Sequence, residues 1–352
     1  MAFLIYDDID QFQSFLGGAV NNSLEETSIE PTAFMVAKKH VIPWLSQTQW
    51  DDLIAAVAGT PTPAQTNLLD YVRRCLALLT MHEYSHVGNI FFGENGMYRM
   101  ESQEMKSAYK YQENDYRNAM FLNGWEAVEW MQLFLDANSA TYTLWAASDS
   151  FTNTRAYFIN YAEEFRAVYT KKLTRSTFEV LRPLIDELET FAILPLIGQS
   201  LFDVLKADIL AGTLSANTYR NNLVLLIRKA LAHFVIEEGI KRHWIKFQHD
   251  RVVYNEQLEP QSSEKQSQAS SQQISLKMRH HEEFANRHIS FVKKYLTDNL
   301  DEFPEYQAYL DAQAAEESTE ETDNCDERYP TCGCNYACTC STTKKNKGVF
   351  RL

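Results

Sequence analysis

Apolar residues recur at helical spacing along most of this chain. The clearest stripe consists of Leu223, Leu226, Ile227, Ala230, Leu231, Phe234 and Val235. A weaker stripe consists of Leu69, Val72, Leu76 and Leu79. Because an α-helix has about 3.6 residues per turn, this spacing places apolar side chains on one face of a helix. Both segments are therefore predicted to be amphipathic helices with one buried side.

The two stripes belong to a pattern that occurs twice in the chain. Ile42–Leu53 aligns without a gap with Leu194–Leu205, about 152 residues later, and both segments carry Pro at their second position. After a three-residue shift, Asn67–Ala77 aligns with Asn222–Ala232. Repeats of this kind define the structural unit, because each copy must fold in the same way. The chain is therefore predicted to contain a duplicated domain.

Each copy predicts the same series of helices. In the first copy the expected helices are 3–12, 33–41, 49–58, a long apolar helix from 67, and 103–135. In the second copy they are 158–169, 184–193, 200–210, a long apolar helix from 222, and 274–309. With only 12 Gly and 9 Pro in 352 residues, the composition favours helices over turn-rich β structure. We predict an all-α protein of two tandem homologous helical bundles, repeat 1 over 1–145 and repeat 2 over 146–312.

Some segments have no counterpart in the other copy. Repeat 2 carries a polar, low-complexity insertion at 255–273, and a linker rich in Ser and Thr over 138–155 joins the copies. A tail over 313–352 is first acidic and then rich in cysteine. Polar stretches of this composition cannot bury a core, so we expect the insertion to form a mobile loop.

The net charge changes the picture of what the chain binds. It has 47 acidic and 33 basic residues, which give a net charge of −14 at pH 7. A surface that grips nucleic acid needs Lys and Arg against the phosphates, so this balance argues against one. The sequence Met1–Asp8 lacks a basic segment typical of a secretion signal, and no apolar run approaches the ~18 residues of a membrane span. We expect no membrane span and synthesis in a cytoplasm.

One motif suggests catalysis. The residues His82–His86 match the H-E-x-x-H pattern, in which two histidines bind zinc and the glutamate activates a water molecule. The aligned residues of repeat 2, Glu237–Lys241, contain neither histidine, and Asn89 and Phe92 stand where a longer form of the motif needs Gly and His. We interpret the motif as polar positions on the exposed side of a core helix. A zinc metallopeptidase that uses His82, Glu83 and His86 is kept as an alternative.

A second histidine-rich stretch, His280–His288, lies on the last long helix of repeat 2. It contains three histidines together with Glu282, Glu283 and Arg287. Metal binding is one interpretation of this stretch, and a solvated helix face is the other. We predict the solvated face, since charged residues dominate the segment.

The tail concentrates five cysteines between 325 and 340. Cys332, Cys334, Cys338 and Cys340 are candidate ligands for a structural Zn²⁺, although their C-x-C spacing differs from the usual C-x2-C of zinc knuckles. Disulfide bonds formed outside the reducing cytoplasm are an alternative, and an unstructured tail is a third. The tail is therefore either disordered or held together by metal or disulfides.

The duplicated element resembles a known family. Its pattern is a helix, then Ile/Leu-Pro, a Gln, an aromatic–Asp pair and a long apolar helix. This pattern is similar to an uncharacterised family encoded in tailed phages and prophages of Bacteroidetes, which in turn resembles the small helical head–tail connector (adaptor) proteins of tailed phages. The matching residues are clearest over Phe178–Glu238, with Phe158–Phe165 as the leading segment, and fainter over Ile29–Glu83. The resemblance covers both repeats and leaves the tail unexplained.

This resemblance implies a structural protein in the neck of a virion. Adaptors of this type form a ring, commonly of about twelve subunits, that docks on the portal and contacts other neck and tail proteins. DNA would pass through the lumen without specific binding, which suits an acidic chain assembled in the host cytoplasm. We expect no enzymatic activity, no catalytic residues and no cofactor besides the zinc considered for the tail. A non-enzymatic helical scaffold that binds another protein is a further alternative.

Overall fold

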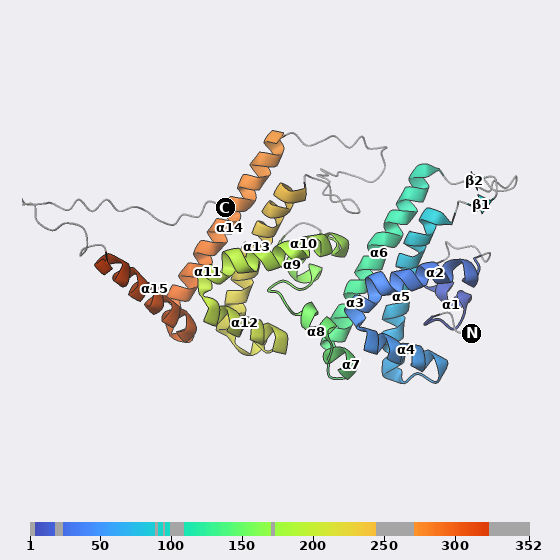
Figure 1. The fold of residues 1–352 in the computed structure, drawn as a ribbon, viewed down its shortest axis with the longest axis horizontal. Helices are drawn as coiled ribbons and strands as arrows, with labels where there is room; N and C mark the ends of the chain where they lie inside the picture. Colours follow the sequence, from blue (N-terminus) through green and yellow to red (C-terminus); the bar gives the residue numbers. More distant parts are fainter. Residues whose placement is uncertain are drawn as a thin grey trace, which may run out of the picture. The chain divides into compact units, whose positions relative to one another are not determined.

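The computed structural model describes residues 4–17, 24–88, 91–93, 96–98, 109–169, 173–243 and 271–323. The chain divides into two compact units, Met1–Tyr306, which holds both repeats, and Gln307–Leu352. The predicted all-α fold is confirmed, since these described residues are almost entirely helical (Figure 1). The exception is a short antiparallel hairpin of β1 (Phe91–Gly93) and β2 (Gly96–Tyr98), which the sequence analysis did not predict.

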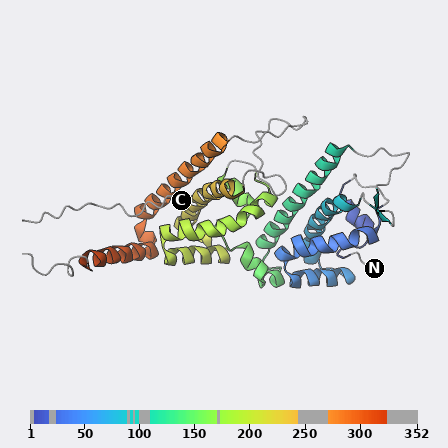
Figure 2. The same cartoon turned by 45° about the horizontal axis from the view of Figure 1, so that its top comes forward.

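The helices of the two repeats follow one another in the same order. Repeat 1 contains α1 (Ile9–Ser14), α2 (Glu26–Val36), the π-helical turn η1 (Ala37–Val41), α3 (Ile42–Leu45), α4 (Gln47–Ala58), α5 (Pro63–Val87) and α6 (Lys110–Ala137). Repeat 2 contains α9 (Ala162–Val168), α10 (Arg175–Leu188), the π-helical turn η2 (Glu189–Ile193), α11 (Leu194–Ile197), α12 (Gln199–Ala211), η3 (Leu214–Ala216), α13 (Thr218–His243) and α14 (Ser271–Asp298). In each repeat the two longest helices pack along each other (Figure 1, Figure 2).

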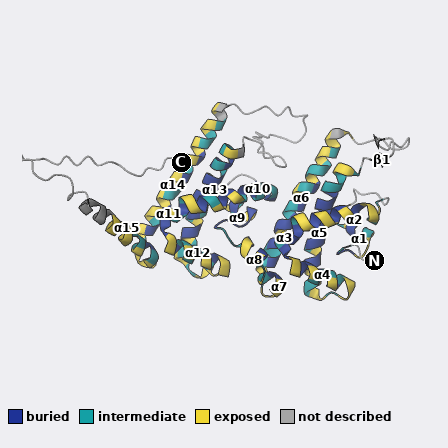
Figure 3. Ribbon diagram, viewed as in Figure 1, coloured by how far each residue is buried: buried dark blue, intermediate teal, exposed yellow. Residues whose placement is uncertain are grey.

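The cores of the two repeats use equivalent positions. Val72 of α5 and Ile227 of α13 are both fully buried, and so are Met131 of α6 and Val292 of α14. Figure 3 shows buried residues along α5 and α13. Removing such a side chain from water stabilises the fold by roughly 1.5–3 kcal/mol. The apolar stripes predicted from the sequence therefore form the inner faces of the long helix pairs. The buried positions Met131 and Val292 also align α6 with α14.

Two predicted boundaries are wrong in repeat 2 and in the linker. The helix expected over 274–309 ends with α14, and the chain continues through η4 (Leu300–Glu302) into α15 (Pro304–Asp323). Pro304 explains the break, because proline has no N–H to donate within a helix and restricts the residue before it. The linker over 138–155 is largely helical and contains α7 (Thr143–Ala146) and α8 (Asp149–Thr154).

The two repeats share one turn geometry, which precedes α4 in repeat 1 and α12 in repeat 2. Ser46 (φ 72°, ψ 151°) and Gly198 (φ 80°, ψ 154°) occupy equivalent positions with nearly identical backbone angles. Positive φ in this region favours glycine, and a residue with a side chain is strained by about 1–3 kcal/mol. Ser46 offsets part of this strain because its hydroxyl accepts a hydrogen bond from the Gln49 N–H (3.3 Å).

Replacing Ser46 with glycine is expected to raise the free energy of unfolding by about 1 kcal/mol, since relief of the strain outweighs the lost cap and the added chain entropy. The reciprocal Gly198→Ser change should lower it by about 1 kcal/mol or more, because it introduces the same strain. Urea denaturation followed by circular dichroism measures both effects. A destabilising Ser46→Gly change would contradict the interpretation of the turn as strained.

An arginine clamp also occurs in both repeats. The Nε atom of Arg73 in α5 donates to the carbonyl of Ile5 (2.7 Å), and that of Arg228 in α13 donates to the carbonyl of Phe158 (2.6 Å). Each guanidinium also forms an ion pair with an acidic residue near the start of its repeat. These charge-assisted hydrogen bonds fix the entry segment of each bundle to its long apolar helix.

Candidate functional site

The structure places the H-E-x-x-H motif at the far end of α5, facing α6. His82 is only 8% exposed, its Nδ1 atom lies 3.1 Å from the carbonyl oxygen of Arg117, and its ring packs against Phe121 (4.8 Å between centroids). The prediction that these positions lie on an exposed side is therefore wrong for His82, because the partner helix α6 covers it. His86 is exposed, and the two imidazole rings are perpendicular with centroids 5.0 Å apart.

Repeat 2 carries an ion pair at the positions of the two histidines. Glu237 is buried, and it pairs with Lys241 one turn later (2.8 Å). Within the part of the chain that the structure describes, no three His, Cys, Asp or Glu side chains are grouped so that they could hold a metal ion. The candidate ligands Cys332, Cys334, Cys338 and Cys340 lie outside the described residues, as does most of the 255–273 insertion.

The histidine-rich stretch of α14 is partly buried rather than solvated. His281 is only 6% exposed, and its Nδ1 atom lies 3.1 Å from the Nδ1 atom of His233 on α13. His288 stacks on the other side of His233, with ring centroids 5.7 Å apart. The predicted solvated face is thus wrong for His281, because α13 packs against this side of α14.

Glu189 is the most strongly perturbed carboxyl group of repeat 2. Burial raises its pKa to about 7, while the neighbouring Lys206 opposes that shift. Its Oε1 atom accepts a hydrogen bond from the N–H of Phe158 (2.5 Å), and its Oε2 atom pairs with the Lys206 ammonium. In repeat 1, Ala37 is equivalent to Glu189 and Ile54 is equivalent to Lys206. The group is satisfied on both oxygens, which indicates a structural role that holds the entry segment of repeat 2.

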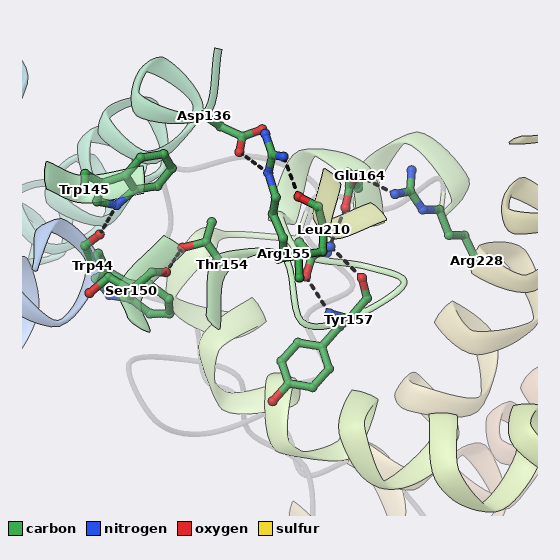
Figure 4. Close-up of polar contacts among 11 residues, drawn as sticks. Trp44, Asp136, Trp145, Ser150, Thr154, Arg155, Tyr157, Glu164, Leu210 and Arg228 are labelled. Carbon is green, nitrogen blue, oxygen red and sulfur yellow. Dashed lines mark hydrogen bonds and ion pairs between the residues drawn. The ribbon is translucent and has the colours of Figure 1, made fainter. Parts of the chain in front are cut away.

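The linker is anchored on repeat 1 by a set of polar contacts (Figure 4). Trp145 of α7 is fully buried, and its indole N–H donates to the carbonyl of Trp44 (2.9 Å). Ser150 of α8 donates to the carbonyl of Pro43 (3.0 Å). Thr154 donates to the carbonyl of Ser150 (2.7 Å; Figure 4). The linker therefore forms part of the packed structure instead of a free tether.

Arg155 connects the two repeats at the end of this linker. Its Nε atom lies 2.6 Å from Asp136 at the end of α6, and its Nη1 atom donates to the carbonyl of Leu210 in α12 (2.8 Å; Figure 4). The guanidinium also lies over the Phe151 ring, 4.7 Å from its centroid. One side chain thereby ties an acidic group of repeat 1 to a backbone carbonyl of repeat 2.

Acidic groups of α6 meet basic groups of repeat 2 next to this contact. Arg166 of α9 pairs with Glu126 and Glu129 of α6, each at 3.3 Å. Glu129 is only 1% exposed, and it also accepts a hydrogen bond from the N–H of Glu163 (2.7 Å). Burial raises the pKa of Glu129, while that hydrogen bond and the Arg166 guanidinium lower it. We call this contact of α3 and α6 with α9 and α10 the joint.

A buried arginine lies at the centre of the joint. Arg175 of α10 is 1% exposed, and its guanidinium lies 2.6 Å from Glu179 and 5.1 Å from the centroid of the Trp44 ring. The Arg182 guanidinium also lies over the Trp44 ring, 4.7 Å from its centroid. Burial lowers the pKa of Arg175 and raises that of Glu179. An open groove of about 500 Å³ next to Trp44 is lined by Tyr157, Glu179 and Arg182 among others.

A second groove, of about 490 Å³, lies over the α5–α6 pair. Its lining residues are Asn67, Asp70, Tyr71, Arg74, Trp130 and Phe134. Trp130 is 51% exposed, and Phe291, at the equivalent position of α14, is 47% exposed. Neither groove brings together a nucleophile, a base and a group that orients the base, which acyl-transfer sites require.

Comparison with known proteins identifies a family without establishing a function. No curated protein and no solved structure matches the chain. A family model described as "Family of unknown function (DUF6712)" matches residues 41–155 and 193–313. The two matched segments start at equivalent positions of the repeats, as the duplication predicts. The chain therefore belongs to this family of unknown function (DUF6712) and contains one family segment in each repeat.

Proposed function

We propose that the chain is a structural subunit of a bacteriophage head–tail connector, which forms a neck ring on the portal and surrounds the DNA channel. The observation that carries the proposal is the duplicated helical unit itself, because the resemblance to connector proteins concerns both copies. The two copies are in contact through the joint, so the chain offers one two-module building block. Such a block suits a ring wall, since a ring repeats one contact many times.

The comparison of the two repeats supports a role based on shape. They share the buried core, the π-helical turns, the positive-φ turn at Ser46 and Gly198, and the arginine clamp. Polar side chains with potential chemistry differ: His82 corresponds to Glu237, and His86 to Lys241. A duplicated fold that retains its framework while its polar groups change is more consistent with a structural than with a catalytic function.

Exposed aromatic residues support protein contacts as the mode of action. Trp130 and Phe291 are each about half exposed at equivalent positions of the two repeats. Exposed aromatic side chains are enriched at protein interfaces, where they contribute much of the binding energy. The net charge of −14 also suits a conduit that does not hold DNA, because like charges repel the phosphate backbone.

Electron microscopy of the purified full-length protein, alone and mixed with the portal protein encoded in the same genome, tests the proposal. We expect closed rings with cyclic symmetry that bind the portal ring, with about twelve copies as the resemblance to connector proteins implies. A chain that stays monomeric beside the portal would favour the helical scaffold instead. Stoichiometric zinc that is lost in a His82→Ala variant would favour the metallopeptidase.

A further inference from the structure

We propose that copies of this chain join head to tail. The contact uses the two surfaces that are equivalent, by the duplication, to the pair that joins the two repeats within one chain. In this arrangement α14 of one copy packs on α1 and α2 of the next copy. The inference deepens the proposed function and rests on it in one respect, since a neck ring needs such a subunit contact. The surfaces themselves are identified from the duplication, the exposure and the charge of the described residues.

The first surface consists of the residues of α14 that are equivalent to the joint residues of α6. On α6 the joint covers Glu129 and Gln132, which are 1% and 0% exposed. With α6 and α14 aligned through their buried core positions, these residues correspond to Ser290 and Lys293. Both are exposed. The surface of the helix pair that is covered in repeat 1 is therefore uncovered in repeat 2.

The second surface consists of the residues of α1 and α2 that are equivalent to the joint residues of α9 and α10. Arg182 of α10 corresponds to Glu30 of α2, and Glu163 of α9 corresponds to Asp10 of α1. Glu30 and Asp10 are exposed, and Phe34, one turn beyond Glu30, is 52% exposed. The surface that repeat 2 uses against repeat 1 is thus uncovered in repeat 1 itself.

The charges of these two uncovered surfaces are complementary. On α14 the exposed face carries Arg287, Lys293 and Lys294, and none of them forms an ion pair with another described residue. On α2 the corresponding face carries the exposed Glu30 and, one turn before it, the half-buried Glu26. The basic face of one copy and the acidic face of the next would attract each other, as opposite charges do across interfaces.

The internal joint has the opposite arrangement of charges. There α6 contributes acidic residues, such as Glu129, and repeat 2 contributes basic residues, such as Arg166 and Arg175. An acidic α1–α2 face would therefore be repelled by the acidic α6, which disfavours an incorrect pairing of repeats. Because the contact joins two different surfaces, it can propagate from copy to copy and close into a ring. The partner that fits both faces is a second copy of this chain.

Charge-reversal variants of the full-length chain test the inference. One variant carries Arg287→Glu and Lys293→Glu on α14, and the other carries Glu26→Lys and Glu30→Lys on α2. A control with Asp51→Lys and Asp115→Lys makes the same charge change as the α2 variant at exposed positions of α4 and α6 outside both faces. Circular dichroism establishes that each variant is folded, and sedimentation velocity measures assembly at low and high salt.

We expect wild type and control to assemble, more weakly as salt is raised, and each variant alone to lose assembly at least tenfold. An equimolar mixture of the two variants should assemble again, because each reversed face then meets an opposite charge. Assembly of either variant like wild type, no recovery in the mixture, or a monomeric wild type would each overturn the inference. Rings that ignore the reversals but bind the portal would leave the proposed function standing. Assembly that follows the charges without portal binding would contradict that function and support the inference.

Discussion

Replacing Glu179 with leucine should destabilise the folded chain by about 3 kcal/mol, because it leaves a buried charge without its partner. Arg175 is 1% exposed, and its closest acidic group is the Glu179 carboxylate at 2.6 Å. The remaining neighbour, Glu129, contributes a weaker attraction and prevents a larger loss. The free energy of unfolding from urea denaturation measures the effect.

The double change Arg175→Met with Glu179→Leu is the matched control. It removes both charges together, and the methionine would pack on the Trp44 and Phe178 rings that now face the guanidinium. Two guanidinium nitrogens of Arg175, Nε and Nη1, make no hydrogen bond within the described structure, so little hydrogen bonding is lost. We expect the free energy of unfolding of the double variant to lie within about 1 kcal/mol of the wild-type value. Equal losses in the single and double variants would contradict the importance of the ion pair.

The same pair of variants connects stability with assembly. If the joint fixes the two repeats as one block, the Glu179→Leu chain should also assemble less than wild type under conditions in which it remains folded. The double variant should assemble normally, because the packing of the joint is retained. This comparison separates the rigidity of the joint from the charges of the exposed faces, which both variants leave unchanged.

Helical periodicity and the duplication were sufficient to predict the architecture. The stripe that contains Leu223 and Ile227 has the period of a helix, and only an apolar face with that period can be buried along its whole length. Alignment of the two copies then predicted the same helix order in both. Helix ends were less predictable, since Pro31 and Pro183 lie inside α2 and α10 without ending them.

The burial of single polar residues could not be predicted in this way. His82 and His281 belong to segments with polar neighbours, but each faces the other long helix of its repeat. Burial of one side chain depends on the partner helix, which the local sequence does not specify. The joint and the linker contacts were missed for a related reason: Arg175 and Trp145 resemble ordinary residues of a helix start and a linker. One signal of the joint was available in the sequence. Repeat 1 has the acidic Glu129 at the position where repeat 2 has the uncharged Ser290.

Acidification should weaken repeat 2 through the histidines between α13 and α14. His233, His281 and His288 lie in contact, with ring centroids of 5.4 Å and 5.7 Å from His233. The equivalent residues of repeat 1 are the apolar Leu78, Met120 and Ala127. Repeat 1 therefore lacks this cluster, although burial also lowers the pKa of His40, which packs on Trp125 of α6, to about 4.

Burial and the charges of His288 and His280 lower the pKa of His233 from 6.5 to about 4. Between these values the unfolded chain binds more protons than the folded chain, so stability rises with pH and falls as pH decreases from about 6.5 to about 4. Lys229 and Arg287 add positive charge near His288, whose pKa is also lowered by burial. Because His233 is partly exposed, we expect a loss of about 2 kcal/mol, less than a shift of this size would give for a fully buried group.

Hydrogen exchange at a series of pH values measures this effect separately in each long helix pair. Converted to opening free energies, the values for α13 and α14 should fall below pH 6.5. A His233→Leu variant, which introduces the residue found in repeat 1, should flatten the dependence in α13 and α14. An unchanged slope at α13 and α14 in the variant would assign the acid sensitivity to other groups. Because α14 also carries the proposed basic contact face, loss of this helix pair in acid should release neighbouring copies as well.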